Sequence, residues 1–467
     1  MNDRAFSSLK LNPVLVENLT SLGYKAMTPI QAESLPQILD GRDVIGQAKT
    51  GSGKTAAFGL GLLDKLDVAR YHVQSLVLCP TRELADQVAR EVRRLGRTIH
   101  NIKVLTLCGG TPFGPQVGSL EHGAHIIVGT PGRVEEHLRK GTLKLNSLTV
   151  LVLDEADRML DMGFQASLDA IVKHTPRQRQ TLLFSATYPD QIQSISKRIM
   201  LHPVMVQVME VHDNESIQQI FYKVDAETKR ITALRLLLLK YHHESTLVFC
   251  NTKRETQELA NQLQQYGFSA LALHGDLEQK VRDQTLVRFA NKSNSILVAT
   301  DVAARGLDID AVNAVINYQI SRDLEVHVHR IGRTGRAGNK GTACTLFTEK
   351  ERYKFEALEK YLQQSLQVAP LPPLKLLDQP AYVPTMATLQ IGGGKKQKVR
   401  PGDILGALTR DVDNDHKVIT GKQVGKINIY DNWSYVAVSL EVVKTALRKL
   451  EQGKLKGRSF RVRRIRG

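Results

Sequence analysis

The stretch "DVIGQAKTGSGKTAAF" (Asp43–Phe58) decides the fold, because a short apolar run leads through a glycine-rich loop into an apolar helix. Glycines in such a loop let backbone N–H groups surround phosphate oxygens. Lys54 would reach the terminal phosphates, and the Thr55 hydroxyl would ligate Mg²⁺. The usual GxxxxGK[ST] pattern begins with glycine, where this chain has Ala48. The other residues of the predicted phosphate-binding loop are Lys49, Thr50, Gly51, Ser52 and Gly53.

A second stretch, "LTVLVLDEAD" (148–157), supplies the acidic groups that such a loop needs. Asp154 ends an apolar run that reads as a buried strand, and ligands of α/β sheets bind at the carboxyl ends of strands. We expect Asp154 to hold the metal and Glu155 to act as a general base or position water. Acids after a strand are often only helix caps, but their pairing with the phosphate-binding loop favours catalysis.

The apolar pattern predicts two successive α/β domains. Short β-branched runs such as "SLVLCP", "HIIVGT" and "TLLFSAT" alternate with longer segments of helical spacing. After a polar break at Glu210–Ser216 the series begins again, with "STLVFCN", "SILVATD" and "TACTLFT". Continuous apolar strands between helices indicate parallel sheets covered on both faces. We place the two domains at residues 1–208 and 209–368.

The last part of the chain has a different pattern. Five prolines in "APLPPLKLLDQPAYVP" (residues 369–384) predict a stiff linker. Residues 385–467 then read β-α-β-β-α-β, the split-βαβ plan of a small α+β domain. This part is also strongly basic: 18 Lys and Arg face 7 Asp and Glu, a net charge of +11 out of +17 for the whole chain. Such an excess favours an anionic partner, and nucleic acid before a membrane.

The four cysteines, the N-terminus and the hydropathy indicate the compartment. Cys79, Cys108, Cys250 and Cys344 form no CxxC pair, so we expect reduced, buried thiols. The N-terminus has no apolar core typical of a signal peptide. No run approaches the ~20 apolar residues that span a bilayer. We therefore expect a cytoplasmic protein.

The stretch "HRIGRTGRAG" (329–338) places arginines every third residue among glycines. An arginine supplied by a second domain can stabilise the charge of phosphoryl transfer. A surface contact to phosphate or RNA is the alternative, and the spacing taken by itself favours that alternative.

Taken together, these motifs resemble those of DEAD-box ATP-dependent RNA helicases, in the order of that family from Phe6 to Arg336. The matching stretches are "GYKAMTPIQ" (23–31), "PTREL" (80–84), Gly109–Gly110, "TPGR" (130–133), "DEAD" (154–157), "SAT" (185–187), "LVFCN" (247–251), "HGDLEQKVR" (274–282), "ATDVAARGLD" (299–308) and "HRIGRTGR" (329–336). The resemblance implies two tandem RecA-like domains that close on ATP and RNA. It covers about four-fifths of the chain.

The family pattern also implies roles for individual residues. Phe6 would stack on adenine and Gln31 would read its edge, since an amide pairs with N6 and N7. Further ATP contacts would come from Tyr24, Thr28, Asp308, Arg333 and Arg336, with Lys54, Asp154, Glu155, Arg333 and Arg336 carrying the chemistry. The coupling residues would be Asp157, Ser185, Ala186, Thr187 and His329. The RNA path would be lined by Arg82, Gly110, Thr130, Arg133, Gly275, Arg282 and Thr300.

The terminal domain resembles an RNA recognition motif with an incomplete aromatic signature. Trp433 and Tyr435 fall on a central strand, and "ATLQI" has no aromatic residue. Trp433 could stack on RNA or belong to the core, and the sequence leaves both open. The basic candidates for RNA contact are Lys395, Lys396, Lys398, Arg400, Arg461, Arg463 and Arg464.

The helicase core, the linker and the basic domain together resemble the DbpA subfamily of bacterial helicases. This resemblance implies a monomer that binds a hairpin of 23S ribosomal RNA during assembly of the large (50S) ribosomal subunit. Two alternatives stay open at this point. One is a general RNA helicase or chaperone of cold adaptation or mRNA decay, and the other is an ATP-gated RNA clamp.

Overall fold

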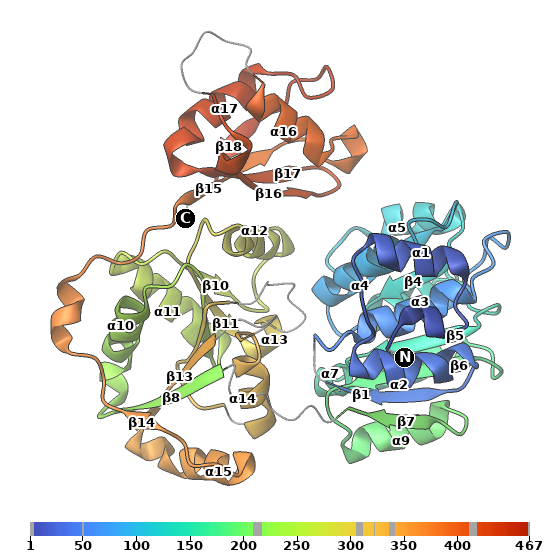
Figure 1. Cartoon of the computed structure of the whole chain (residues 1–467), viewed down its shortest axis with the longest axis horizontal. Helices are drawn as coiled ribbons and strands as arrows, with labels where there is room; N and C mark the ends of the chain where they lie inside the picture. The colour runs from blue at the N-terminus through green and yellow to red at the C-terminus, as the bar shows by residue number, and fades with distance from the viewer. Residues whose placement is uncertain are drawn as a thin grey trace. The chain divides into compact units, whose positions relative to one another are not determined.

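The computed structural model of the chain describes residues 4–48, 51–208, 217–304, 312–321, 323–335, 341–410 and 418–465. The chain divides near residue 211 into two compact units. The first contains one seven-stranded sheet; the second contains another seven-stranded sheet and a four-stranded sheet. Figure 1 shows the strands and helices of each part. The predicted fold, two RecA-like parallel-sheet domains and a small α+β domain, is confirmed.

The first sheet has the strand order β3-β4-β2-β5-β6-β1-β7, and every neighbouring pair is parallel. Its strands are β1 (Val44–Gln47), β2 (Ser75–Leu78), β3 (Val104–Leu107), β4 (Ile126–Gly129), β5 (Val150–Asp154), β6 (Gln180–Ser185) and β7 (Val204–Gln207). Its helices are α1 (Pro13–Ser21), α2 (Pro29–Leu39), α3 (Lys54–Asp64), α4 (Arg82–Leu95), α5 (Phe113–Glu121), α6 (Pro131–Arg139), α7 (Ala156–Asp161), α8 (Gln165–Lys173) and α9 (Asp190–Ile199).

Both faces of this sheet are buried, which explains the continuous apolar runs of its strands. Val77 packs into a core with helices α1–α4, whereas the next residue, Leu78, packs into a second core with α6, α8 and α9. The predicted runs became β1 to β6, and β7 was not predicted.

The second parallel sheet has the order β10-β11-β9-β12-β13-β8-β14. Its strands are β8 (Ile217–Val224), β9 (Thr246–Cys250), β10 (Ala270–Leu273), β11 (Ile296–Thr300), β12 (Ala314–Asn317), β13 (Gly341–Thr348) and β14 (Val368–Ala369). Its helices are α10 (Arg230–Tyr241), α11 (Lys253–Gln265), α12 (Gln279–Ala290), α13 (Asp301–Ala304), α14 (Leu324–Ile331) and α15 (Arg352–Leu362).

The proline-rich segment differs from the predicted spacer. Its first residue, Ala369, belongs to β14, which pairs with β8. Leu371, Leu376 and Leu377 then pack against the core of the second RecA-like domain, and the ring of Tyr382 meets His242 edge-on at 5.5 Å. The three leucines explain why this segment is not a free spacer. Packing against the core that includes α10 removes part of their apolar surface from water, which is favourable.

The terminal domain has the predicted β-α-β-β-α-β order and a four-stranded antiparallel sheet in the order β16-β17-β15-β18. Its elements are β15 (Met386–Ile391), α16 (Pro401–Thr409), β16 (Val424–Ile429), β17 (Ser434–Ser439), α17 (Val443–Gln452) and β18 (Val462–Arg464). Leu389, Val436 and Val462 face the core that includes α16 and α17. The alternating residues therefore face away from these helices.

The four thiols are buried and unpaired with one another, as expected. Burial raises the pKa of each thiol, to about 12 for Cys108 and Cys344. Among the helices that the structure describes, none has both the length and the hydropathy of a bilayer-spanning segment.

Candidate nucleotide and RNA sites

The phosphate-binding loop connects β1 to α3, with β1 lying between β6 and β7 in the first sheet. Gly51 and Gly53 have φ values of 89° and 97°, in the left-handed region. A Cβ atom on Gly53 would lie 2.5 Å from Nε2 of Gln31, so no larger residue fits there without displacing that amide. Lys49 and Thr50 lie outside the described residues.

Lys54, the first residue of α3, lies near Asp154 at the end of β5, and Thr55 is its neighbour in the helix. The Lys54 ammonium donates to the backbone carbonyl of Ala48 at 2.7 Å and is buried. Burial raises the pKa of Asp154 to about 7, although the nearby charge of Lys54 opposes this rise. Oδ1 of Asp154 is buried and has no hydrogen-bond partner among the described residues. A buried carboxylate oxygen and the Thr55 hydroxyl are oxygen donors of the kind that Mg²⁺ prefers, so these residues fit the ion.

Glu155 adopts an unusual backbone conformation directly after β5. Its φ and ψ are 51° and 54°, the left-handed region, where it caps the N-terminus of α7. This conformation costs a residue with a Cβ atom about 1 kcal/mol or more. Only 5% of the Glu155 surface is exposed. The turn thus places two adjacent carboxylates in different backbone conformations at one strand end.

Asp157, in the first turn of α7, joins the ends of β5 and β6. Its Oδ2 accepts hydrogen bonds from the N–H and the hydroxyl of Thr187, and its own N–H donates to Oγ of Ser185 at 3.4 Å. Ala186 lies between these two residues, and its carbonyl accepts from Nε2 of Gln47 on β1 at 3.4 Å. The predicted coupling residues of the first domain therefore lie together.

The side-chain amide of Gln31 makes two hydrogen bonds, one to the backbone just before α2 and one to the phosphate-binding loop. Its Oε1 accepts from the Thr28 N–H at 2.9 Å, and its Nε2 donates to the Gly53 carbonyl at 3.1 Å. Phe6 is 95% buried, and its ring meets Tyr24 edge-on at 6.1 Å. Burial and the hydrogen bond to Glu91 raise the pKa of Tyr24 to about 12. Of the predicted adenine-binding residues, Gln31 and Thr28 therefore lie against the phosphate-binding loop, and Phe6 and Tyr24 pack against one another.

The predicted RNA contacts of the first domain follow β2, β3 and β4, which are neighbours in the sheet. Arg82 begins α4, Gly110 follows β3 with φ 73°, and Thr130 precedes α6. Nη2 of Arg133 donates to the carbonyl of Thr111 at 3.0 Å, and this bond connects the segment after β4 to the loop after β3. The strand order thus gathers residues far apart in the sequence.

In the second domain, Gly275 and Thr300 follow the neighbouring strands β10 and β11. Nη2 of Arg282, on α12, donates to the carbonyl of Ala303 on α13 at 3.3 Å, so Arg282 lies beside the end of β11. His329 lies on α14 and Arg333 follows it. Asp308 and Arg336 lie outside the described residues.

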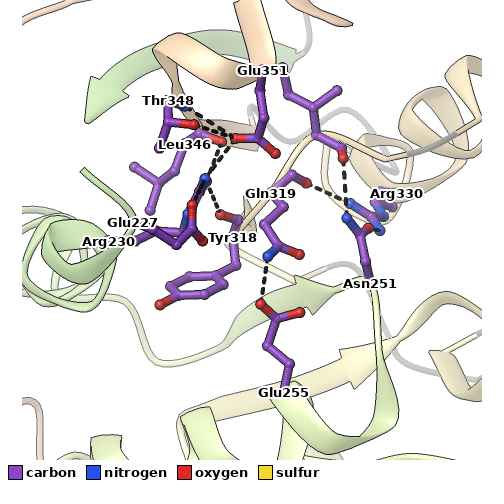
Figure 2. A network of polar contacts seen from close by, with 11 residues as sticks. Glu227, Arg230, Asn251, Glu255, Tyr318, Gln319, Arg330, Leu346, Thr348 and Glu351 are labelled. Atoms are coloured by element: carbon purple, nitrogen blue, oxygen red, sulfur yellow. Dashed lines mark hydrogen bonds and ion pairs between the residues drawn. The ribbon is translucent and has the colours of Figure 1, made fainter. Parts of the chain in front are cut away.

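The sequence did not distinguish Arg330 from the other arginines of its motif. Arg330 is 99% buried and donates hydrogen bonds to Asp301, Asn251 and Gln319, the last two of which Figure 2 shows beside it, whereas Arg333 lies beyond the end of α14. One feature of the sequence could have indicated that Arg330 is buried. It lies next to His329 in the second half of α14, where the other residues are apolar.

The terminal domain brings its first basic cluster against an aromatic turn. The N–H groups of Lys395 and Lys396 donate to the carbonyls of Tyr430 and Asp431, and Tyr430 stacks on Trp433 with the ring centroids 6.4 Å apart. The side chains of Lys395, Lys396, Lys398 and Arg400 are exposed. Sequence reasoning missed Tyr430.

Phe460 and Arg461 contact Gly392 and Gly393, which lie just before this basic cluster. Gly392 donates to the backbone carbonyl of Arg461 at 2.9 Å, and a Cβ atom on Gly393 would lie 2.5 Å from the ring of Phe460. Arg461, Lys395 and Trp433 therefore border one surface, which we call the basic–aromatic surface. It comprises Lys395, Lys396, Lys398, Tyr430, Trp433, Phe460 and Arg461.

Tyr435 is not available for stacking in this arrangement, contrary to the expectation that it contacts RNA. Its side chain is fully buried on the sheet face opposite the helices, and Gln284 of α12 hydrogen-bonds to it. On the same face, Thr388 accepts a hydrogen bond from Asn291 at 2.9 Å. Arg463 is also engaged, since its Nε donates to Gln390 at 2.9 Å.

Comparison with protein families finds three matching models along the chain. Residues 28–195 match the DEAD/DEAH box helicase model, residues 228–338 match the helicase conserved C-terminal domain, and residues 388–464 match the DbpA RNA binding domain. The curated ATP-dependent RNA helicase DbpA of Escherichia coli (strain K12) is 52% identical over 460 residues, covering 98% of this chain and 99% of that protein. The DEAD-box ATP-dependent RNA helicase CshA of Bacillus cereus is 44% identical over 371 residues, 79% of this chain and 70% of CshA.

Among solved structures, S. cerevisiae Dbp5 bound to RNA and ADP BeF3 is similar, with a TM-score of 0.71 and 31% identity over 79% of this chain and 96% of that chain. The structure of Mss116p bound to ssRNA and AMP-PNP has a TM-score of 0.70 at 26% identity, covering 79% of this chain and 78% of that chain.

Proposed function

Because the chain belongs to the DEAD-box ATP-dependent RNA helicases of the DbpA type, we propose that its terminal domain delivers the motor to one hairpin of 23S ribosomal RNA during assembly of the large (50S) subunit. The motor would then unwind RNA next to that hairpin, in the cytoplasm. The basic–aromatic surface carries this proposal, because it combines exposed lysines with stacked rings.

For ATP turnover we assign one role to each group at the end of β5. Asp154 and Thr55 would hold Mg²⁺, which when bound neutralises phosphate charge. Lys54 binds the terminal phosphates, and Glu155 orients the attacking water and takes its proton. Arg333 and Arg336 stabilise the transferring phosphoryl group, and Asp308 lies near the ribose.

The motor alone is expected to be blind to sequence. The predicted contacts lie at strand ends or on the helices beside them, where arginine side chains, hydroxyls and exposed backbone suit phosphate and sugar: Arg82, Gly110, Thr130, Arg133, Gly275, Arg282 and Thr300. Such contacts fix the position of an RNA without reading its bases. Choice of target must then come from another surface, and single-stranded loops are read by stacking and by hydrogen bonds to base edges.

The basic–aromatic surface meets that requirement. Tyr430 and Trp433 stack on one another beside the exposed Lys395 and Lys396, which supply attraction to phosphate. The indole N–H of Trp433 is buried and has no hydrogen-bond partner among the described residues. Arg461 brings a further charge to the same place.

The test compares the full chain with a chain that ends at Pro384, using a 23S hairpin fragment and a scrambled hairpin of equal length. The full chain should bind and unwind duplexes next to the true hairpin preferentially. The truncated chain should hydrolyse ATP at saturating RNA but lose the preference. Equal use of both hairpins by the full chain would instead indicate a general RNA helicase, and ATP-dependent binding without strand separation would indicate a clamp.

A further inference from the structure

We infer that Arg330 is a positioning residue that transmits RNA contact at Thr300 to the phosphate contact of Arg333. This inference rests on the proposed role of Arg333 in ATP turnover. It concerns a residue that belongs to the same motif but does not reach the nucleotide itself.

The side chain of Arg330 is engaged on all sides. Its Nε and Nη2 donate to the two carboxylate oxygens of Asp301 at 2.6 and 2.8 Å. Nη2 also donates to Oδ1 of Asn251 at 2.8 Å, and Nη1 donates to the carbonyl of Gln319 at 3.0 Å. With 1% of its surface exposed, this guanidinium cannot extend toward a phosphate. A bidentate pair fixes both distance and orientation.

The partners of Arg330 lie at the ends of three adjacent strands. Asp301 directly follows Thr300 at the end of β11, Asn251 follows β9, and Gln319 follows β12. The sheet order β11-β9-β12 makes these strands neighbours. The guanidinium therefore holds α14 against this edge of the sheet, as Figure 2 shows for Asn251 and Gln319.

Thr300 is connected to this ion pair by a peptide bond, and Arg333 by a backbone hydrogen bond. Asp301 is bonded to Thr300, and the Arg333 N–H donates to the Arg330 carbonyl at 3.2 Å. A shift of Thr300 on RNA would thus move Asp301, Arg330 and the turn that bears Arg333 together. Stability alone does not account for a buried ion pair, because apolar residues of equal volume often serve as well.

Arg230 provides a matched control in the same domain. It is fully buried, its Nη2 donates to Glu227 and Glu351, and its Nη1 donates to the carbonyls of Tyr318 and Leu346. Figure 2 shows it in the same polar region, on the α10 side. None of its partners is a predicted RNA or nucleotide contact, so its role should be structural.

The experiment measures kcat, the KM for ATP and the ratio of RNA-stimulated to basal turnover in full-length R330K, D301N and R230K. Misplacement of a reacting group by about 1 Å can cost on the order of 100-fold in rate. We expect R330K and D301N to lower kcat 10- to 100-fold, flatten RNA stimulation and leave KM nearly unchanged.

R230K should lower the midpoint of thermal unfolding while its folded fraction keeps the normal kcat and stimulation ratio. If R330K does not fold, N251A, which removes one bond of the set, should show a smaller change in the same direction.

A double-mutant cycle separates this inference from the proposed function. R330K should slow R333A no further, because both act on one phosphate contact. R333A at the normal rate would overturn the assigned role of Arg333. A slow R333A combined with normal stimulation in R330K, or with fully additive losses, would overturn the positioning role alone.

Discussion

The carboxylate of Asp157 accepts hydrogen bonds from both the N–H and the hydroxyl of Thr187, at 3.1 and 3.0 Å. This pair joins the turn after β5, which bears Asp154 and Glu155, to the turn after β6. Any movement of the acidic turn during ATP turnover is therefore communicated to the neighbouring strand end.

Replacing Thr187 with valine should uncouple these turns. The variant loses the hydroxyl bond to a charged acceptor, worth about 1.5–3 kcal/mol, but keeps the shape and the backbone bond. We expect ATP turnover to persist while strand displacement per ATP falls several-fold. Parallel ATPase and unwinding assays measure this ratio. Thr149→Val, which removes a hydroxyl bonded to the carbonyl of Gln74 at 3.0 Å, is the control and should leave the ratio unchanged.

Glu155→Gln should abolish turnover and spare binding. Glutamine has the size of glutamate but cannot take a proton from water, so the chemical step loses its base. RNA-dependent ATP binding, measured with a fluorescent analogue, should stay near that of the unaltered chain. Turnover at the normal rate would remove Glu155 from the chemistry.

Glu155→Gly should make the first domain more stable and equally inactive. Glycine adopts a φ of 51° without the clash that a Cβ atom causes, while its extra freedom in the unfolded chain offsets part of the gain. Loss of a buried carboxylate beside Asp154 adds to the stabilisation. Denaturant unfolding should show a net gain of roughly 1 kcal/mol. A loss of stability would mean that contacts of Glu155 outweigh its backbone strain.

His327 should make the second domain sensitive to acid. Burial, and secondarily the charge of Arg330, lower its pKa to about 3, and neither ring nitrogen has a hydrogen-bond partner among the described residues. Between pH 6.5 and 3 the unfolded chain binds this proton and the folded chain does not, so stability falls as the pH falls through that window. Each pH unit costs up to about 1.4 kcal/mol.

His327→Phe should remove this dependence and keep the stacking on Phe221, whose ring centroid lies 5.9 Å away. Unfolding by denaturant at pH 7 and pH 5 measures the difference. An unchanged pH dependence in the variant would assign the acid sensitivity to other groups.

The basic residues at the end of the chain should contribute unequally to RNA affinity. Arg461 borders the basic–aromatic surface, whereas Arg463 is held by Gln390. Arg461→Gln should weaken hairpin binding and lower the salt slope by about one unit for each lost phosphate contact. Arg463→Gln is the matched comparison and should change the slope less. Equal slopes for both variants would mean that the pairing with Gln390 opens on RNA binding.

Most of the fold was predictable from the sequence. The strands of the two parallel sheets are mostly buried on both faces, and such strands appear in a sequence as continuous apolar runs. Three parallel strands, β7, β8 and β14, were missed for a physical reason. In β7 and β8, exposed and half-buried residues interrupt the buried ones, and "IQQIFYKV" has two glutamines after its first residue, whereas β14 has only two residues, neither of them buried. Edge or amphipathic strands do not produce a continuous apolar run.

The candidate site was predictable where chemistry depends on residue type at fixed spacing, as in the phosphate-binding loop and the acidic turn. It was not predictable where burial decides the role. Arg330 and Arg333 are alike in sequence, and only packing makes one inaccessible. Tyr435 was expected to contact RNA, yet the face that bears it is covered.

The burial of all four thiols makes the protein suitable for site-specific labelling. Because their pKa values are raised, few thiolates form near neutral pH, and reagents that modify cysteine will react slowly with them. Cysteines introduced at Leu201 in the first domain and Tyr353 in the second, which are 65% and 67% exposed, would carry a donor and an acceptor dye without replacement of any native residue in the core. Energy transfer between these dyes would test in solution whether the two domains close on ATP and RNA, in the otherwise unaltered chain.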